Sequence, residues 1–143
     1  IVAVLAHEIG HYKRRHILQG MLVSVLRLGA LFLLLSFFLR APALFAAFGL
    51  AQPSVHVGLV LFLLFYSPAS LVLDVAANWW SRRREFEADR FAAETPRRPQ
   101  DLASALKKLS VNNLANLTPH PVHVFLRYSH PPVLKRVEAL GDT

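Results

Sequence analysis

The sequence predicts an all-α integral membrane protein in which two transmembrane helices accompany helices that carry a zinc site. Long apolar runs and a metal-binding motif with helical spacing predict this class. Of the 143 residues 54% are hydrophobic, and they are concentrated at 17–39 and 55–73 instead of lying in amphipathic stripes. Two buried core helices are the alternative, but a soluble domain of this size could not cover such helices on all sides.

A helix is predicted over residues 2–16, and it carries the motif H-E-x-x-H at residues 7–11. Positions i and i+4 lie on one face of an α-helix, so His7 and His11 can bind one metal ion. Glu8 follows the first histidine, where it can take a proton from an attacking water molecule. This pattern indicates a zinc hydrolase site, and a chance occurrence is the alternative.

The two apolar runs have the length that a membrane requires. A helix rising about 1.5 Å per residue needs about 20 residues to cross about 30 Å of hydrocarbon. We therefore interpret 17–39 and 55–73 as transmembrane helices joined by the loop 40–54. Basic residues precede the first run, at 13–15, and follow the second, at 82–84. The positive-inside tendency then places both outer ends, and the zinc site, in the cytoplasm.

The chain has a formal net charge of +7 and no cysteine. Such a charge also suits nucleic-acid binding, but here it lies at the membrane edges without a nucleic-acid motif, so no nucleic-acid partner is expected. The lack of cysteine excludes disulfides, thiolate metal ligands and a cysteine nucleophile.

A catalytic zinc ion usually takes three protein ligands, so one more is needed. His16 falls on about the opposite face of the predicted motif helix and is interpreted as an interfacial histidine. The better candidate lies in residues 81–92, which two membrane crossings return to the side of the motif. Glu85 and Asp89 share a helical face there, so one can bind zinc while its neighbour orients a ligand histidine, and Glu85 is the favoured ligand. A solvated charged helix is the alternative.

Three segments, at residues 7–13, 81–92 and 128–132, together with the helical hairpin, resemble the M48 zinc metalloproteases, and among them the Ste24-type CAAX prenyl proteases. The resemblance implies one zinc ion per chain, with Glu8 as general base. It implies that Asp89 does not bind the zinc itself but contacts one of the zinc ligands. The zinc ligands that it implies are His7, His11 and Glu85.

The same resemblance implies a protein of seven transmembrane helices that enclose a chamber. Residues 1–143 are then a single M48 domain fragment with the last two of those helices. Its parts are the motif helix at 1–16, the two spans, and a third-ligand helix with a C-terminal catalytic segment at 75–143. The N-terminal transmembrane helices of the same protein would be its partners.

The C-terminal part predicts an amphipathic helix at 100–110, irregular structure at 112–132 and a final helix at 131–140. From the residues alone, His130 is as compatible with a turn as with a site. The resemblance places it by the zinc, where it would bond to the substrate carbonyl or the tetrahedral intermediate. It also suggests that Arg136 bonds to a site carboxylate such as Asp89, with a surface arginine as the alternative.

The expected function is that of a membrane zinc endopeptidase. The resemblance implies that its reaction is the C-terminal processing of prenylated proteins. Its expected partners are a peptide or protein substrate, possibly prenylated, and the lipid bilayer. One alternative is a broad quality-control protease of the heat-shock M48 type. Another is a catalytically silent zinc-binding scaffold, against which the intact Glu8 argues. Prenyl dependence would separate the two kinds of protease.

Overall fold

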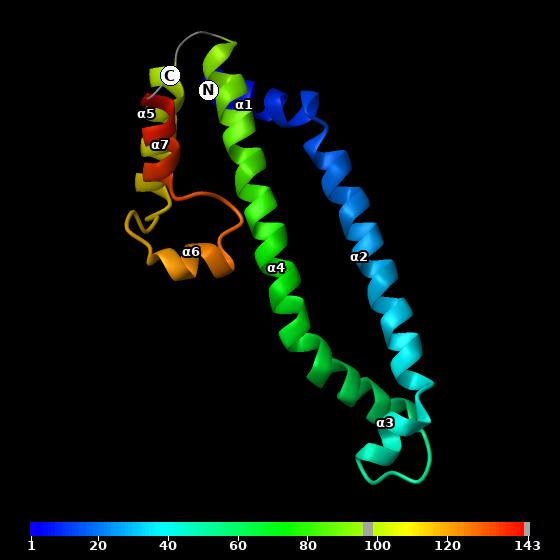
Figure 1. Cartoon of the computed structure of the whole chain (residues 1–143). Helices are drawn as coiled ribbons and strands as arrows, with labels where there is room; N and C mark the ends of the chain where they lie inside the picture. Colours follow the sequence, from blue (N-terminus) through cyan, green and yellow to red (C-terminus); the bar gives the residue numbers. More distant parts are fainter. Residues whose placement is uncertain (96–98, 142–143) are drawn as a thin grey trace. The chain divides into compact units, whose positions relative to one another are not determined.

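The computed structural model describes residues 1–95 and 99–141, and within these ranges every regular element is an α-helix (Figure 1). The chain divides into two compact units. The site unit comprises Ile1–Ile17 and Leu73–Thr143, and the hairpin unit comprises Leu18–Val72. The helices are α1 (Val2–Lys13), α2 (His16–Leu39), α3 (Pro42–Ala47), α4 (Val55–Glu94), α5 (Pro99–Asn112), α6 (Pro121–Arg127) and α7 (Val133–Gly141).

The hairpin unit has a small apolar core made by helices that approach closely. Phe45, Leu61 and Phe62 are buried in it. A Cβ atom added at Gly58 would lie 2.6 Å from Leu39 Cδ2 and 3.1 Å from Phe45 Cζ. The glycine therefore creates the room in which α3 and the end of α2 pack against the start of α4.

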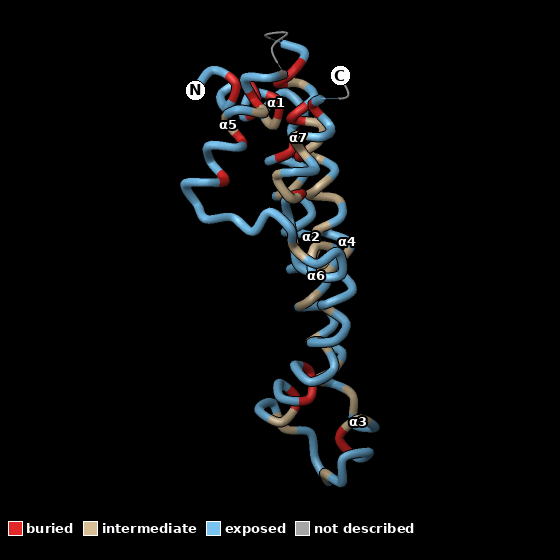
Figure 2. The backbone as a smooth tube through the Cα atoms, turned by 90° about the vertical axis from the view of Figure 1, so that its left-hand side faces the viewer, coloured by how far each residue is buried: buried red, intermediate tan, exposed pale blue. Residues whose placement is uncertain are grey.

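Both α2 and α4 are long and apolar enough, by length and composition, to cross a membrane. In the most apolar 18-residue stretch of each helix, 0% of the residues of α2 and 11% of those of α4 are buried. Figure 2 shows the same contrast, with buried residues gathered around α1, α5 and α7 and the long helices largely exposed. Such apolar surface needs lipid or other helices to cover it, because soluble monomers rarely expose so much. The predicted all-α class with two candidate membrane helices is confirmed.

The motif helix is shorter than predicted, because α1 ends at Lys13 and does not reach His16. Arg15 adopts φ 55°, in the left-handed region that non-glycine residues seldom occupy. Its backbone N–H donates to the Tyr12 carbonyl at 3.0 Å, and α2 begins at the next residue. The motif helix and the helix that begins at His16 are therefore separate elements.

Four other predicted segments differ from the structure. The second apolar run and the third-ligand helix form one helix, α4, of 40 residues with Pro68 inside it. The predicted loop 40–54 contains α3, and the region predicted to be irregular contains α6. The last predicted helices are present, as α5 and α7.

The site unit packs α1, α4, α5 and α7 around small side chains. A Cβ atom added at Gly10 would lie 3.1 Å from Phe91 Cδ1 and 3.2 Å from Ala88 Cα. Glycine and alanine at this crossing let α1 lie directly on α4, so the motif residues come close to α4 side chains. The buried core consists of Ala3, Ala6, Ala92, Ala93, Leu102, Leu106 and Leu140.

Candidate metal centre

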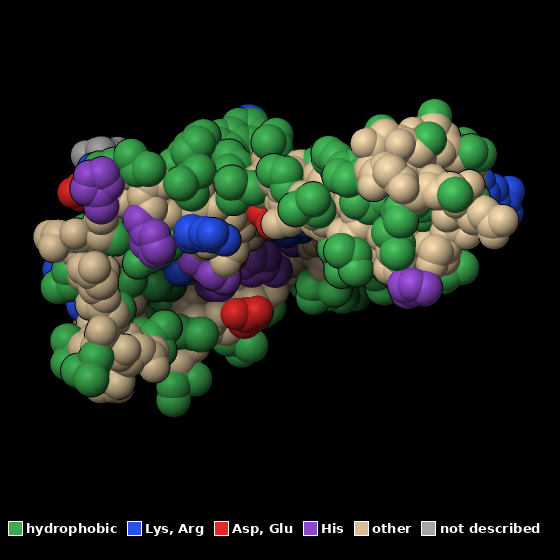
Figure 3. Space-filling view, turned by 90° about the horizontal axis from the view of Figure 1, so that it is seen from below, with side chains coloured by type: hydrophobic (Ala, Val, Ile, Leu, Met, Phe, Trp, Pro, Cys, Tyr) green, Lys and Arg blue, Asp and Glu red, His purple; other side chains and the backbone are tan. Residues whose placement is uncertain are grey.

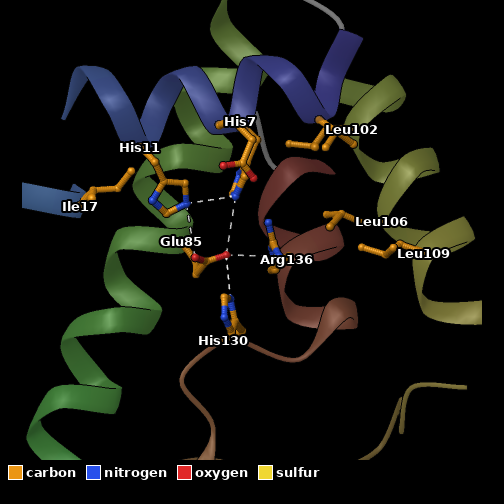
Figure 4. A pocket seen from close by; sticks show the side chains of 11 residues that line it. His7, His11, Ile17, Glu85, Leu102, Leu106, Leu109, His130 and Arg136 are labelled. Atoms are coloured by element: carbon orange, nitrogen blue, oxygen red, sulfur yellow. Dashed lines mark hydrogen bonds and ion pairs between the residues drawn. The ribbon is translucent and has the colours of Figure 1, made fainter. Parts of the chain in front are cut away.

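Three side chains from two helices converge in the site unit (Figure 4). His7 and His11 project from one face of α1, and their Nε2 atoms lie 3.1 Å apart. Glu85 reaches them from α4, with Oε1 3.4 Å from His11 Nε2 and Oε2 3.7 Å from His7 Nε2. The close packing of α1 on α4 thus brings the two motif histidines to a carboxylate far away in the sequence.

The donor set and its spacing fit a zinc ion. Tetrahedral coordination at about 2.0–2.1 Å separates ligand atoms by about 3.3 Å. The separations of 3.1, 3.4 and 3.7 Å between these side-chain atoms lie around that value. Two imidazoles and one carboxylate are also the donors of catalytic zinc sites that keep a position open. Within the described residues, His7, His11 and Glu85 are the group whose ligand atoms could hold a metal ion.

Asp89 and Arg136 lie behind His7. Asp89 Oδ1 is 2.9 Å from His7 Nδ1. The two atoms are close enough for a hydrogen bond, but their angle departs from hydrogen-bond geometry. Arg136 donates to the same carboxylate through Nε at 2.7 Å and Nη2 at 2.6 Å, which is a bidentate pair. Its Nη1 also lies 3.4 Å from Glu85 Oε2. Arg136 therefore joins the carboxylate behind His7 to the carboxylate beside the two histidines.

Burial and these contacts set the charges around the site. Burial raises the pKa of Asp89, which lies beyond the apolar run 55–73, but the contacts with Arg136 and His7 outweigh burial and lower this pKa overall. Burial lowers the pKa of Arg136, and Asp89 more than reverses this, so the pair is ionised. Burial also lowers the pKa of His11, against the opposing effect of Glu85. The lowered pKa favours the neutral form of His11, which is the form that binds metals.

His16 lies beside His11, although the sequence placed it on the opposite face of the motif helix. That expected position is wrong, because the break at Arg15 turns the chain back. His16 is 4% exposed, and its Nδ1 lies 3.1 Å from His11 Nδ1. Its Nε2 lies 3.4 Å from Glu87 Oε2, and its carbonyl accepts a hydrogen bond from Arg84 at 2.8 Å. No sequence motif indicates the position of His16, because this position follows from the break between α1 and α2.

A pocket of about 550 Å³ opens onto the converging side chains. Glu8 is exposed and lines this pocket beside the histidines. His130 lines it from the segment between α6 and α7, and its Nδ1 lies 3.1 Å from Glu85 Oε2. Figure 3 shows histidine, acidic and basic side chains gathered amid largely apolar surface. The apolar lining consists of Val4, Ile17, Leu102, Leu106 and Leu109.

The structure thus brings all the predicted site residues together in one unit. The pocket is lined by the candidate metal ligands His7, His11 and Glu85, by the carboxylate of Glu8 and by the imidazole of His130. Two motif histidines, a carboxylate from a second helix and the motif glutamate are the side chains that a helical metalloprotease requires.

A family model described as Peptidase family M48 matches residues 1–143. The chain belongs to this family of zinc metalloproteases. The family resemblance predicted from the sequence is confirmed.

The curated relatives include the "CAAX prenyl protease 1 homolog" of Homo sapiens, 37% identical over 142 residues, which covers 98% of this chain and 30% of the relative. The "CAAX prenyl protease 1" of Saccharomyces cerevisiae is 28% identical over 155 residues, covering 98% and 34%. The crystal structure of S. mikatae Ste24p matches with a TM-score of 0.83 and 28% identity, covering 98% of this chain and 36% of that one. The chain thus spans about a third of the length of these relatives.

Proposed function

We propose that this chain forms the zinc site of a membrane endopeptidase that cleaves near the C-terminus of prenylated proteins. The observation that carries the proposal is the convergence of His7, His11 and Glu85 in a pocket that Glu8 also lines. The printed names of the relatives supply the substrate class, since both curated relatives named above are CAAX prenyl proteases.

The proposed reaction is the hydrolysis of a peptide bond, with zinc held by His7, His11 and Glu85. Zinc, when bound there, supplies a Lewis acid that polarises the scissile carbonyl and lowers the pKa of water. Glu8 accepts the proton of the attacking water and delivers it to the leaving amine. Asp89, fixed by Arg136, holds the His7 ring in the orientation that binding requires.

His130 is proposed to stabilise the negative charge that develops on the carbonyl oxygen. Its ring lies beside Glu85 and its side chain is 66% exposed, so a substrate in the pocket can reach it. A hydrogen-bond donor aimed at developing oxyanion charge is typically worth about 3 kcal/mol of barrier.

The membrane setting suits such a substrate. A prenyl group holds a protein at the bilayer surface, and the same chain that carries the site has two candidate spans. We propose that the site faces the cytoplasm, because basic residues flank both apolar runs. We also propose that further transmembrane helices surround the site, as the greater length of the relatives suggests.

The test uses the longest natural protein that contains this chain, purified in detergent with zinc, and a Glu8→Gln variant. One C-terminal peptide is offered with and without a farnesyl group on its cysteine, and cleavage is followed by mass spectrometry. We expect cleavage of the farnesylated peptide alone, and none by Glu8→Gln although it keeps its zinc. Near wild-type cleavage by Glu8→Gln would overturn the mechanism.

Two other outcomes of the same assay correspond to the alternatives. Equal cleavage of both peptides would indicate a broad membrane protease, and cleavage of neither by the zinc-loaded protein would favour a scaffold. The names of the relatives favour neither alternative.

A further inference from the structure

We propose that Arg82 is a positioning residue for His130. It acts by holding the end of α6, and thereby the segment 128–132 that leads from α6 to α7. This inference rests on the proposed function, because it concerns the group that is proposed to stabilise the oxyanion.

Side chains of α4 bind the backbone at the end of α6. Arg82 Nη1 donates to the carbonyl of Val124 at 3.2 Å and to that of Tyr128 at 2.5 Å. Asn78 Nδ2 donates to the carbonyl of Leu126 at 3.1 Å. The Val124 carbonyl also accepts a hydrogen bond from the backbone N–H of Tyr128 at 3.2 Å. The carbonyls of Leu126 and Tyr128 lie at the end of α6, where carbonyls lack partners within the helix, and a cation at this end is favoured by the helix dipole. Arg82 provides both the donor and the charge.

These bonds are important because α6 contains no buried residue among those that the structure describes. A helix without a buried face gains little from apolar packing, so its position depends on its polar contacts. At its other end, the His120 side chain accepts a hydrogen bond from the backbone N–H of Val122. The contacts with Arg82 and Asn78, by comparison, tie α6 to another helix.

The helix α4 therefore positions both residues of the contact between His130 and Glu85, because it carries Glu85 and also holds the segment that carries His130. The residues concerned share one face of α4, at the spacing of successive helical turns. Arg82 fixes the carbonyl of Tyr128, and two residues later His130 Nδ1 lies 3.1 Å from Glu85 Oε2. The face consists of Asn78, Arg82, Glu85 and Asp89.

Arginine suits this position better than lysine. Its planar guanidinium carries several N–H donors in a fixed geometry, whereas the lysine ammonium is a compact charge on a flexible stem. Arg82→Lys should therefore keep the charge but hold the two carbonyls of Val124 and Tyr128 less firmly. We expect its activity to lie between that of the wild type and that of Arg82→Ala.

The decisive experiment is a double-mutant cycle with Arg82→Ala, His130→Ala and both together, in the longest natural protein with the farnesylated peptide. Since displacement of a reacting group by about 1 Å can cost about 100-fold, we expect Arg82→Ala to lower kcat by about 10- to 100-fold. The double variant should be no slower than His130→Ala alone. Arg90→Ala, an exposed arginine on the same helix, is the matched control and should keep the wild-type kcat.

Two readouts do not depend on turnover. Zinc content should be unchanged in Arg82→Ala, because Arg82 contacts none of the three ligands through the bonds described above. Amide hydrogen exchange in residues 121–132 should become faster in Arg82→Ala and stay unchanged in Arg90→Ala.

The outcomes separate this inference from the proposed function. If His130→Ala is slow and the losses of the two single variants multiply in the double variant, Arg82 does not act through His130 and the inference is wrong. Unchanged amide exchange in Arg82→Ala would also overturn it. If His130→Ala keeps full activity, the proposed role of His130 fails and the inference falls with it.

Discussion

His16 and Glu87 form a chain of contacts that ends on a candidate zinc ligand. His11 presents Nε2 to the site and Nδ1 to His16, which in turn contacts Glu87. The group behind a metal-ligating histidine fixes the orientation of its ring, and its loss typically costs about 10- to 100-fold in metal affinity.

We therefore expect His16→Gln to weaken zinc affinity by about 10- to 100-fold, as measured by competition with a chelator of known affinity. His56→Gln changes an exposed histidine of the hairpin unit and serves as the control. Equal zinc affinities for wild type, His16→Gln and His56→Gln would show that His16 does not orient His11.

The pair of Asp89 and Arg136 is buried, with side chains 4% and 11% exposed. Removal of one partner leaves a buried charge without compensation, which costs about 3–5 kcal/mol. We expect Arg136→Met to lower the free energy of unfolding of the zinc-free protein by that amount, measured by denaturant titration in detergent.

The double variant Asp89→Leu with Arg136→Met separates stability from metal binding. Replacing both charges by apolar groups is often neutral for stability, so the double variant should recover most of the loss. Its zinc affinity should be lower than that of the wild type, because nothing then supports the His7 ring. Recovered stability together with wild-type zinc affinity would contradict the role proposed for Asp89.

The candidate site residues that were predicted from the sequence are those at a regular helical spacing and those in a known motif. His7 and His11 share a helical face by spacing, and Glu85 followed from the return of the chain after two crossings. His16 and Arg82 were missed for a physical reason. Their roles depend on a backbone break and on carbonyl partners, and neither leaves a pattern of residue types.

At the scale of elements, the crossing of α1 over α4 at Gly10 sets the distance between the motif histidines and Glu85. Gly10→Val places branched carbon atoms where a Cβ would already lie 3.2 Å from the backbone of Ala88. Backbone cannot move aside as a side chain can, so α1 must move away from α4.

We expect Gly10→Val to lower zinc affinity by at least about 10-fold, since ligand atoms displaced together lose the geometry that zinc requires. Gly141→Val, at the end of α7 with open space around it, is the matched control. Zinc affinity in Gly10→Val that equals that of Gly141→Val would show that the crossing does not set the site.

Helix type was predictable, whereas helix boundaries were not. The apolar runs predicted α2 and the first part of α4 because length and composition alone decide such segments. The end of α1 was missed because Arg14 and Arg15 are neither glycine nor proline, the usual signals of a break. The segment that became α6 was obscured by its prolines, although Pro121 stands at the first helical position, where proline is favoured.

For the whole molecule, the central expectation is the orientation of the chain in a membrane. The chain has no cysteine, so a single introduced cysteine reports one position within it. Gln52→Cys lies between α3 and α4, and Lys107→Cys lies on α5; both positions are exposed. In intact cells we expect a membrane-impermeant thiol reagent to label Gln52→Cys and to label Lys107→Cys only after the cells are opened. The reverse pattern would contradict a cytoplasmic site.

Zinc anomalous diffraction from crystals of the longest natural protein, grown with zinc, tests the proposed metal site most directly. We expect one peak per chain, within about 2.0–2.2 Å of His7 Nε2, His11 Nε2 and a carboxylate oxygen of Glu85. We also expect the peak to persist in Glu8→Gln. A peak held by other residues, or no peak in a protein that cleaves the farnesylated peptide, would show that these three side chains do not form the catalytic zinc site.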